Sequence, residues 1–299
     1  MNRPTASLVR APARRRVLAE RAGWVLLAGG ALLASTLVVL IAGYLLSESL
    51  PLLVQGGVTR FFTDDGWWPL EGSFNLLPML SASLLLTLGA LLLATPLSLV
   101  FAVYAVFYAP AAVGVLLRQL VDISAAVPTV IYGLWGLATI VPLLATVKPP
   151  GASLLAGMLV LAVMIFPTLT VLSQSALRAV PTGYAQAAQA LGVSRSATLL
   201  RVVLPAAHHG IAAAMALGAA RAIGETMVVL MVCGNVVQMP ASFWAPVRTL
   251  TANIALEMPY AMHTHRTSLF VAGLGVLLLV AGLVAASETV AHRARHVRT

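Results

Sequence analysis

The chain has 299 residues, of which 60% are hydrophobic and only 9% are charged. A soluble domain carries about 25% charged residues, so this composition excludes a soluble enzyme and is typical of an integral membrane protein. The net charge of +9 comes mostly from arginines that flank apolar runs. That pattern indicates membrane topology and contact with lipid headgroups, and it argues against nucleic-acid binding.

Six apolar runs are long enough to cross a bilayer, which takes about 20 residues in a helix. We therefore predict an all-α integral membrane protein with six transmembrane helices. The prolines in the second and third runs predict kinks or breaks in those helices. The first run is too long for a signal peptide, so we expect it to be retained as a span. The runs cover residues 24–46, 76–106, 117–145, 152–173, 206–234 and 267–287.

The basic residues predict the orientation of these spans. With the N-terminus in the cytoplasm, thirteen basic residues lie on the cytoplasmic side and four on the opposite side. Because arginine and lysine concentrate in cytoplasmic segments, both termini are expected inside. Residues 1–23 and 288–299 then form cytoplasmic tails, and 47–75 forms a periplasmic segment. Residues 76–287 form a core of five spans, and a second external segment covers 235–266.

The cytoplasmic segment 174–205 has the pattern of two short helices. An alanine-rich stretch ends at Gly192, which suits a left-handed position at the end of a helix. Ser194 can cap the second helix, and Pro205 suits the first turn of the next span. The many small residues would let the surface of another protein approach closely.

The fifth run contains two charged residues, Arg221 and Glu225. A charge at the bilayer centre costs roughly 2.5–3.5 kcal/mol, so such residues usually line a substrate or ion path. In a continuous helix they would share one face and could form a structural ion pair. Alternatively, Arg221 binds an anion while Glu225 holds it in place, since the planar guanidinium donates two parallel hydrogen bonds to a phosphate. The sequence leaves both interpretations open.

Part of the cytoplasmic segment resembles the EAA loop of ABC importer permeases. The matching positions are Gln186-Ala187-Ala188, then Gly192, then Val203-Leu204-Pro205. Gln186 departs from the pattern because the family has glutamate there. The resemblance implies a type I ABC importer permease (MetI-like) architecture, in which this loop docks into an ATPase subunit. The docking residues that it implies are Gln186, Ala187, Ala188, Gly192, Leu204 and Pro205.

Two further stretches, 126–137 and 218–235, resemble the spans of phosphate importer permeases of the PstC type, and so does the tryptophan-rich segment 67–78. The likeness covers about residues 60–290. It implies that Arg221, Glu225 and Thr226 belong to the translocation path of inorganic phosphate. The implied setting is the bacterial inner membrane, surrounded by lipid. The implied partners are a second, PstA-like permease subunit, two ATP-binding subunits and a periplasmic phosphate-binding protein.

The sequence contains no G-x-x-x-x-G-K-[ST] loop, so we expect no nucleotide site and no enzyme activity in this chain. No cofactor or metal is expected either. The alternatives are a permease for sulfate or molybdate, a secondary transporter that uses Arg221, Glu225 and Asp122, and a sensor whose loop docks a kinase. We found no internal repeat, which disfavours the secondary transporter. Outside the membrane, Arg248 and Arg266 either contact a docking partner or lie in an ordinary solvated loop, and Trp67 and Trp68 are expected at the membrane interface.

Overall fold

The computed structural model describes residues 13–296. Within this range the regular structure is helical apart from one two-stranded hairpin and an isolated bridge between Gly234 and Val247, in agreement with the predicted fold class. The ends of both expected tails, residues 1–12 and 297–299, lie outside the described residues. The long helices are α1 (Ala13–Gly56), α3 (Leu77–Val103), α7 (Leu154–Arg178), α10 (Leu204–Ile223) and α13 (His263–His296).

Shorter elements join the long helices. The α-helices among them are α2 (Arg60–Thr63), α4 (Ala111–Ala126), α5 (Thr129–Trp135), α6 (Val141–Ala145), α8 (Thr182–Ala190), α9 (Arg195–Thr198), α11 (Met227–Val232) and α12 (Leu250–Glu257). Strands β1 (Trp67–Trp68) and β2 (Ser73–Phe74) pair antiparallel around the 3₁₀-helix η1 (Pro69–Glu71). Three π-helical segments extend or join helices, namely η2 (Tyr104–Tyr108), η3 (Gly136–Ile140) and η4 (Leu199–Val203).

Five helical segments in the described range are long and apolar enough to cross a membrane. The predicted third span is a bent pair, in which α4 and the helix from α5 to α6 meet at 91°. Counted as one span, this pair brings the total to the expected six. The bend falls at Val127 and Pro128, because proline disfavours helical geometry in the residue before it, and Val127 is extended.

The predicted fifth span is wrong as a continuous helix. Helix α10 ends at Ile223, and α11 begins only at Met227. Gly224 occupies the C-cap of α10. Glycine is about 1 kcal/mol less favourable than alanine inside a helix, so it weakens the helix at this point. The break separates the two charged residues that were expected to share one helix face.

Helices α3, α7 and α11 pack closely at the centre of the bundle. A side chain at Gly157 on α7 would come within 2.4 Å of the Cys233 sulfur and 2.5 Å of Leu86 on α3. Glycine at this position therefore permits the close approach of the three segments. Cys233 is fully buried in this core.

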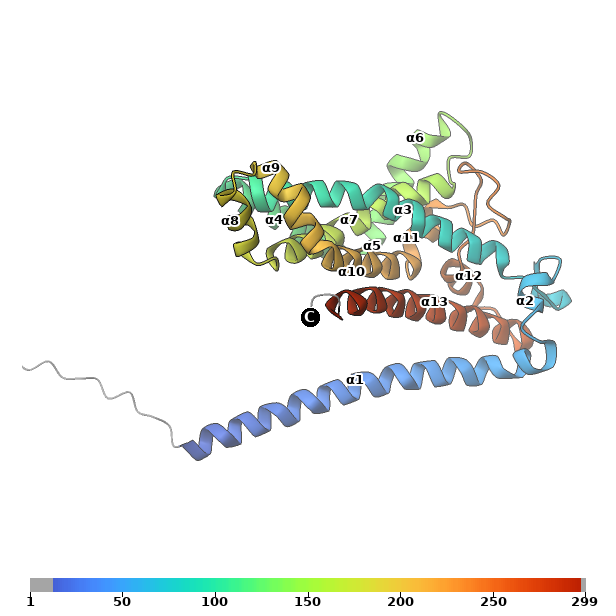
Figure 1. Cartoon of the computed structure of the whole chain (residues 1–299). Helices are drawn as coiled ribbons and strands as arrows, with labels where there is room; N and C mark the ends of the chain where they lie inside the picture. Colours follow the sequence, from blue (N-terminus) through green and yellow to red (C-terminus); the bar gives the residue numbers. More distant parts are fainter. Residues whose placement is uncertain (1–12, 297–299) are drawn as a thin grey trace, which may run out of the picture.

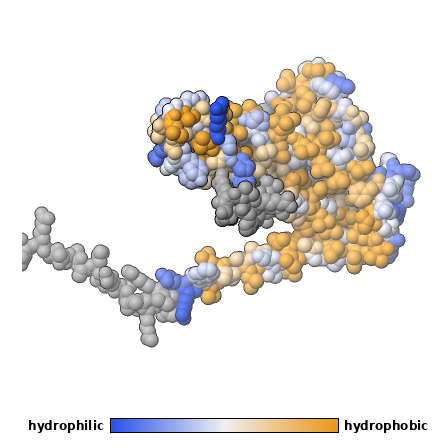
Figure 2. All heavy atoms as spheres, in the orientation of Figure 1, coloured by the Kyte–Doolittle hydropathy of each residue, from blue (hydrophilic) through white to orange (hydrophobic). Residues whose placement is uncertain are grey.

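The two ends of the bundle have different structures (Figure 1). Helices α8 and α9 lie at one end, and α2 with the β-hairpin lies at the other. The surface between these ends is mainly apolar, and hydrophilic residues gather at the ends (Figure 2). Helix α1 leaves the bundle along its N-terminal half, and its C-terminal half contacts α13, where the rings of Tyr44 and Phe270 are 5.6 Å apart.

Candidate functional site

The guanidinium group of Arg221 is held by another helix. Arg221 is half-buried in the last turn of α10, and its Nη1 donates a hydrogen bond to Thr168 Oγ1 on α7 at 2.7 Å. The ion pair with Glu225, one of the two interpretations that the sequence leaves open, is wrong, because no ion pair joins these two described side chains. A guanidinium has five N–H donors, so the bond to Thr168 leaves most of its capacity for a ligand.

Glu225 lies in the break between α10 and α11, with 9% of its surface exposed. Its carboxylate accepts a hydrogen bond from the Val228 amide at 3.3 Å, and its carbonyl accepts one from Thr251 Oγ1 at 2.8 Å. Thr226 is half-buried beside it, at the N-cap of α11. The structure thus places the three predicted path residues at one interruption of the helix, which we call the charged turn (Arg221–Thr226).

The structure confirms the predicted local pattern of the cytoplasmic segment. Helix α8 ends before Gly192, which has a φ of 75°. The Gly192 amide donates to the Gln189 carbonyl at 2.9 Å, and Ser194 Oγ accepts from the Ala197 amide at 3.4 Å. The Arg195 guanidinium donates to the Phe107 carbonyl and so ties α9 to the end of η2.

The residues expected to dock an ATPase divide into exposed and buried positions. Gln186 and Ala187 are exposed on α8, whereas Ala188 is only 8% exposed and packs inward. Leu204 begins α10, and Pro205 lies in its first turn, as predicted. Leu191 is 83% exposed directly after α8, which places a large apolar side chain on this surface. Sequence reasoning did not single it out.

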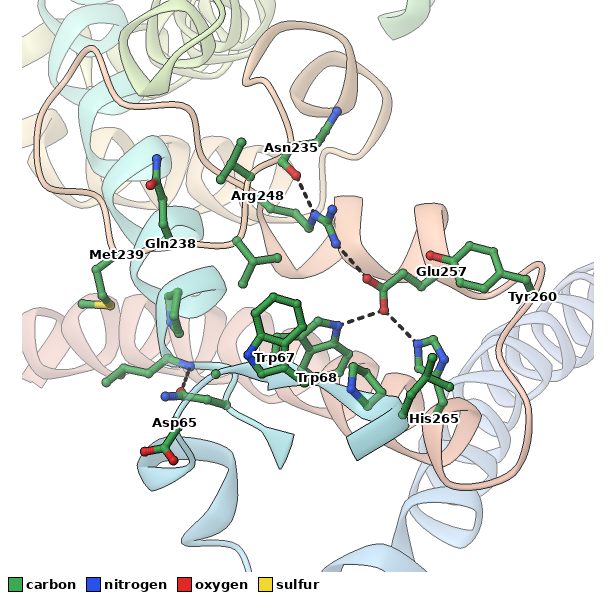
Figure 3. A pocket seen from close by; sticks show the side chains of 18 residues that line it. Asp65, Trp67, Trp68, Asn235, Gln238, Met239, Arg248, Glu257, Tyr260 and His265 are labelled. Carbon is green, nitrogen blue, oxygen red and sulfur yellow. Dashed lines mark hydrogen bonds and ion pairs between the residues drawn. The ribbon is translucent and has the colours of Figure 1, made fainter. Parts of the chain in front are cut away.

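A cavity of about 840 Å³ opens at the other end of the bundle. Sequence reasoning noted some of its residues separately and did not predict that they meet. The cavity lies between the β-hairpin, the segment after α11 and the start of α13 (Figure 3). Its lining includes Trp67, Trp68, Asn235, Arg248, Glu257, Tyr260 and His265.

Glu257 is the centre of a buried polar cluster at this cavity (Figure 3). Its Oε1 accepts from Arg248 Nη1 at 2.7 Å, and its Oε2 lies 2.9 Å from Trp67 Nε1 and 2.8 Å from His265 Nε2. Arg248 is therefore engaged within its own chain, which fits neither a free docking contact nor an ordinary solvated loop. No sequence motif pointed to Glu257, which only the fold brings beside residues distant in the chain.

The part of the chain that the structure describes contains no group of three or more His, Cys, Asp or Glu side chains able to hold a metal ion. Within this part, His265 contacts Glu257 through its Nε2 atom at 2.8 Å. At the break in the membrane helix, the charged groups are the Arg221 guanidinium and the Glu225 carboxylate.

Comparisons with known proteins identify the family. Residues 94–296 match the family described as binding-protein-dependent transport system inner membrane component. The probable ABC transporter permease protein YqgH of Bacillus subtilis is 33% identical over 273 residues, covering 89% of this chain and 88% of that protein. The phosphate transport system permease protein PstC of Xylella fastidiosa is 30% identical, covering 83% of this chain and 84% of that protein.

Solved structures agree on the fold. One structure of the MetNI methionine ABC transporter in an inward-facing conformation superposes with a TM-score of 0.60 at 18% identity, covering 73% of this chain and 95% of that chain. An amino acid ABC transporter superposes with a TM-score of 0.55 at 15% identity, covering 73% and 93%. The chain is a multi-pass membrane protein of the type I ABC importer fold, and it belongs to the family of binding-protein-dependent transport system inner membrane components.

Proposed function

We propose that this chain is a permease subunit of an ATP-driven inorganic phosphate importer, and that it forms the translocation path with a second permease subunit. The observation that carries the proposal is the charged turn. Arg221 is held by a neutral hydroxyl, has no carboxylate partner among the described side chains of residues 20–286, and lies at a break in a membrane helix. Relatives named as phosphate permeases, such as PstC of Mesorhizobium japonicum, support the choice of anion.

The chemistry of the turn suits a partly protonated phosphate. The Arg221 fork can donate two parallel charge-assisted hydrogen bonds to phosphate oxygens. Glu225 can accept a hydrogen bond from a protonated phosphate oxygen, which sulfate lacks at neutral pH. Thr226 adds a hydroxyl that can donate or accept. This division of roles favours phosphate over a fully ionised oxyanion.

The two ends of the bundle suit different partners. The exposed face of α8, with Gln186, Ala187 and Leu191, is the proposed contact with one of two separate ATP-binding subunits. The outer end would face the periplasm and receive a phosphate-binding protein. This arrangement places both termini in the cytoplasm of a bacterial inner membrane. ATP hydrolysis would occur on the partner subunits.

Uptake of radiolabelled phosphate tests the proposal directly. The chain is reconstituted with its partner permease, its ATP-binding subunits and its binding protein in proteoliposomes. We expect uptake that depends on ATP and is inhibited by vanadate. Unlabelled phosphate should inhibit uptake of the label, whereas an excess of sulfate or molybdate should not. If sulfate or molybdate competes as well as unlabelled phosphate does at equal concentration, the substrate assignment would change to another oxyanion. Uptake that follows an ion gradient without ATP would reject an ABC mechanism.

A further inference from the structure

The short helix α11 is held by a stretch of chain that lies outside it in sequence. At its N-terminal end, the Glu225 carbonyl accepts a hydrogen bond from Thr251 Oγ1 at 2.8 Å. At its C-terminal end, the Val247 amide donates to the Cys233 carbonyl at 2.9 Å. Residues 247–257, which we call the clamp segment, therefore contact both ends of α11. Since α11 has only six residues, its own hydrogen bonds cannot fix its position.

A third contact joins the clamp segment to Asn235, three residues after the end of α11. Arg248 Nε donates to the Asn235 carbonyl at 2.9 Å. Gly234 and Asn235 both have positive φ, at 85° and 56°, so the chain turns sharply there. The Asn235 side chain in turn donates to the Leu230 carbonyl at 2.6 Å. Arg248 thus fixes the turn that follows α11, and the geometry of this turn sets the direction of the chain after the helix.

The far end of the clamp segment is fixed by the cluster around Glu257. This carboxylate, 7% exposed, joins Arg248 of the clamp segment to His265 on α13 and to Trp67 on β1. A buried carboxylate is tolerated only when its hydrogen-bonding capacity is satisfied, and here both of its oxygens are used. The cluster therefore locks α12 to two other parts of the outer surface.

We propose that Arg248, Thr251 and Glu257 are positioning residues for the charged turn. The Glu257 cluster fixes α12 outside the membrane, and Thr251 transfers that position to the Glu225 backbone. The inference rests on the proposed role of the charged turn in translocation. Because Trp67, Arg248, Glu257 and His265 also line the outer cavity, a molecule that enters the cavity contacts the residues that hold the turn.

The first test isolates one hydroxyl group. Thr251→Val removes the bond to Glu225 with little change in volume, and Thr251→Ser keeps it. Thr267→Val is the matched control, because the Thr267 hydroxyl contacts only the His263 carbonyl of its own helix at 3.3 Å. Thr251 Oγ1 also lies 3.2 Å from Thr249 Oγ1. Thr249→Ser, which retains the Thr249 hydroxyl, is therefore a second control.

Two readouts are measured in the reconstituted transporter. The first is the kinetics of phosphate uptake, in which the maximal rate is compared with the concentration of binding protein that gives half of this rate. The second is the rate at which a thiol reagent modifies a cysteine at Thr226→Cys, which needs no phosphate. For Thr251→Val we expect about a fivefold lower maximal rate and about fivefold faster labelling, the ratio given by loss of one hydrogen bond. Thr251→Ser and Thr267→Val should match the parent protein in both.

The second test asks whether the outer cluster acts through Thr251. Glu257→Gln should change both readouts in the same direction as Thr251→Val. If Glu257→Gln does not fold, Trp67→Phe replaces it; this variant removes one donor to the same carboxylate and should have a smaller effect in the same direction. Combined with Thr251→Val, neither should add its full effect, since all act along one path. Additive effects, or unchanged labelling in Thr251→Val, would overturn the inference.

The outcomes also separate this inference from the proposed function. If the parent protein takes up no phosphate while the labelling changes as expected, the choice of substrate fails and the positioning role stands. If the parent takes up phosphate and Thr251→Val leaves both uptake and labelling unchanged, the positioning role fails and the function stands.

Discussion

Arg221 on α10 donates a hydrogen bond to Thr168 on α7, 2.7 Å away, although a carboxylate lies only four residues further along its own chain. The interruption of α10 at Gly224 removes Glu225 from the helix face of Arg221. The guanidinium is consequently oriented by a hydroxyl that does not neutralise its charge. Such an arrangement leaves a positive charge at the break for an anion to meet.

The Thr168 contact predicts a matched pair of variants. Thr168→Val removes the hydroxyl that orients Arg221, whereas Thr168→Ser retains it. Because a hydrogen bond to a charged group contributes about 1.5–3 kcal/mol, we expect Thr168→Val to lower phosphate uptake at least tenfold. Thr168→Ser should stay within about threefold of the parent. Equal uptake in both variants would show that the hydroxyl does not orient the guanidinium.

The absence of an ion pair between Arg221 and Glu225 predicts the result of a charge exchange. Arg221→Glu combined with Glu225→Arg should not transport, because Arg221 lies in the last turn of α10 whereas Glu225 lies in the break after it, and the two have different partners. Arg221→Gln alone should also abolish uptake, since a neutral amide lacks the charged fork. The measurement is radiolabelled phosphate uptake at equal membrane abundance. Near-normal uptake by the exchanged protein would place the anion site elsewhere.

Gly192 predicts a backbone effect in the cytoplasmic segment. An added side chain would meet no atom within 4 Å, so only its φ of 75° disfavours substitution. The left-handed conformation costs most residues about 1–2 kcal/mol and asparagine less. We expect ATP-dependent uptake to fall strongly in Gly192→Val, and much less in Gly192→Asn. Gly183→Ala, also without close neighbours, is the control. Equal uptake in all three would contradict a fixed turn.

Gly157 predicts a packing effect in the core. Gly157→Ala would force its methyl group against Cys233 and Leu86, and overpacking of this kind costs about 1–3 kcal/mol. We expect a lower thermal unfolding midpoint in detergent. Gly275→Ala on α13, where nothing lies within 4 Å, should leave the midpoint unchanged or raise it slightly. A stable Gly157→Ala protein would mean that α3, α7 and α11 can separate without loss.

Cysteine labelling tests the orientation in the membrane. Cysteines in place of Asp65 and Met262, both exposed at the outer end, should react in intact cells with an impermeant thiol reagent. A cysteine in place of Gly183 should react only after the membrane is opened. Cys233 is fully buried, so the background should be low. Thr249 is unsuitable as a reporter because it is 3% exposed and caps α12. Labelling of Gly183→Cys from outside would invert the topology.

The sequence allowed the fold class to be predicted because its signals are local. The apolar length of each span, Gly192 at the end of α8, and Ser194 at the start of α9 all depend on neighbouring residues. The break at Gly224 was missed because the hydropathy of 206–234 is continuous and glycine is common in membrane helices. The hydrogen bonds that stabilise the break come from Val228 and from Thr251, and the latter is distant in sequence.

The candidate site was predicted in part. Arg221 and Glu225 were singled out because charges are rare in an apolar run, and Thr226 was added by the family resemblance, yet the partners of these residues could not be inferred. Thr168 is one of many hydroxyl residues in the spans, and nothing in the local sequence distinguishes it. Glu257 escaped notice for the same reason, since 190 residues separate it from Trp67. Contacts of this kind depend on the tertiary fold alone.

Helix α1 has 44 residues and is therefore about 66 Å long, roughly twice the hydrocarbon thickness of a bilayer. Only three residues separate its end at Gly56 from α2, which leads directly into the hairpin that carries Trp67. In a thicker or thinner bilayer, hydrophobic mismatch changes the tilt of such a helix. Because α1 leads into this hairpin, and Trp67 and Trp68 line the cavity, the lipid composition of the host membrane would bear on the geometry of the cavity rim.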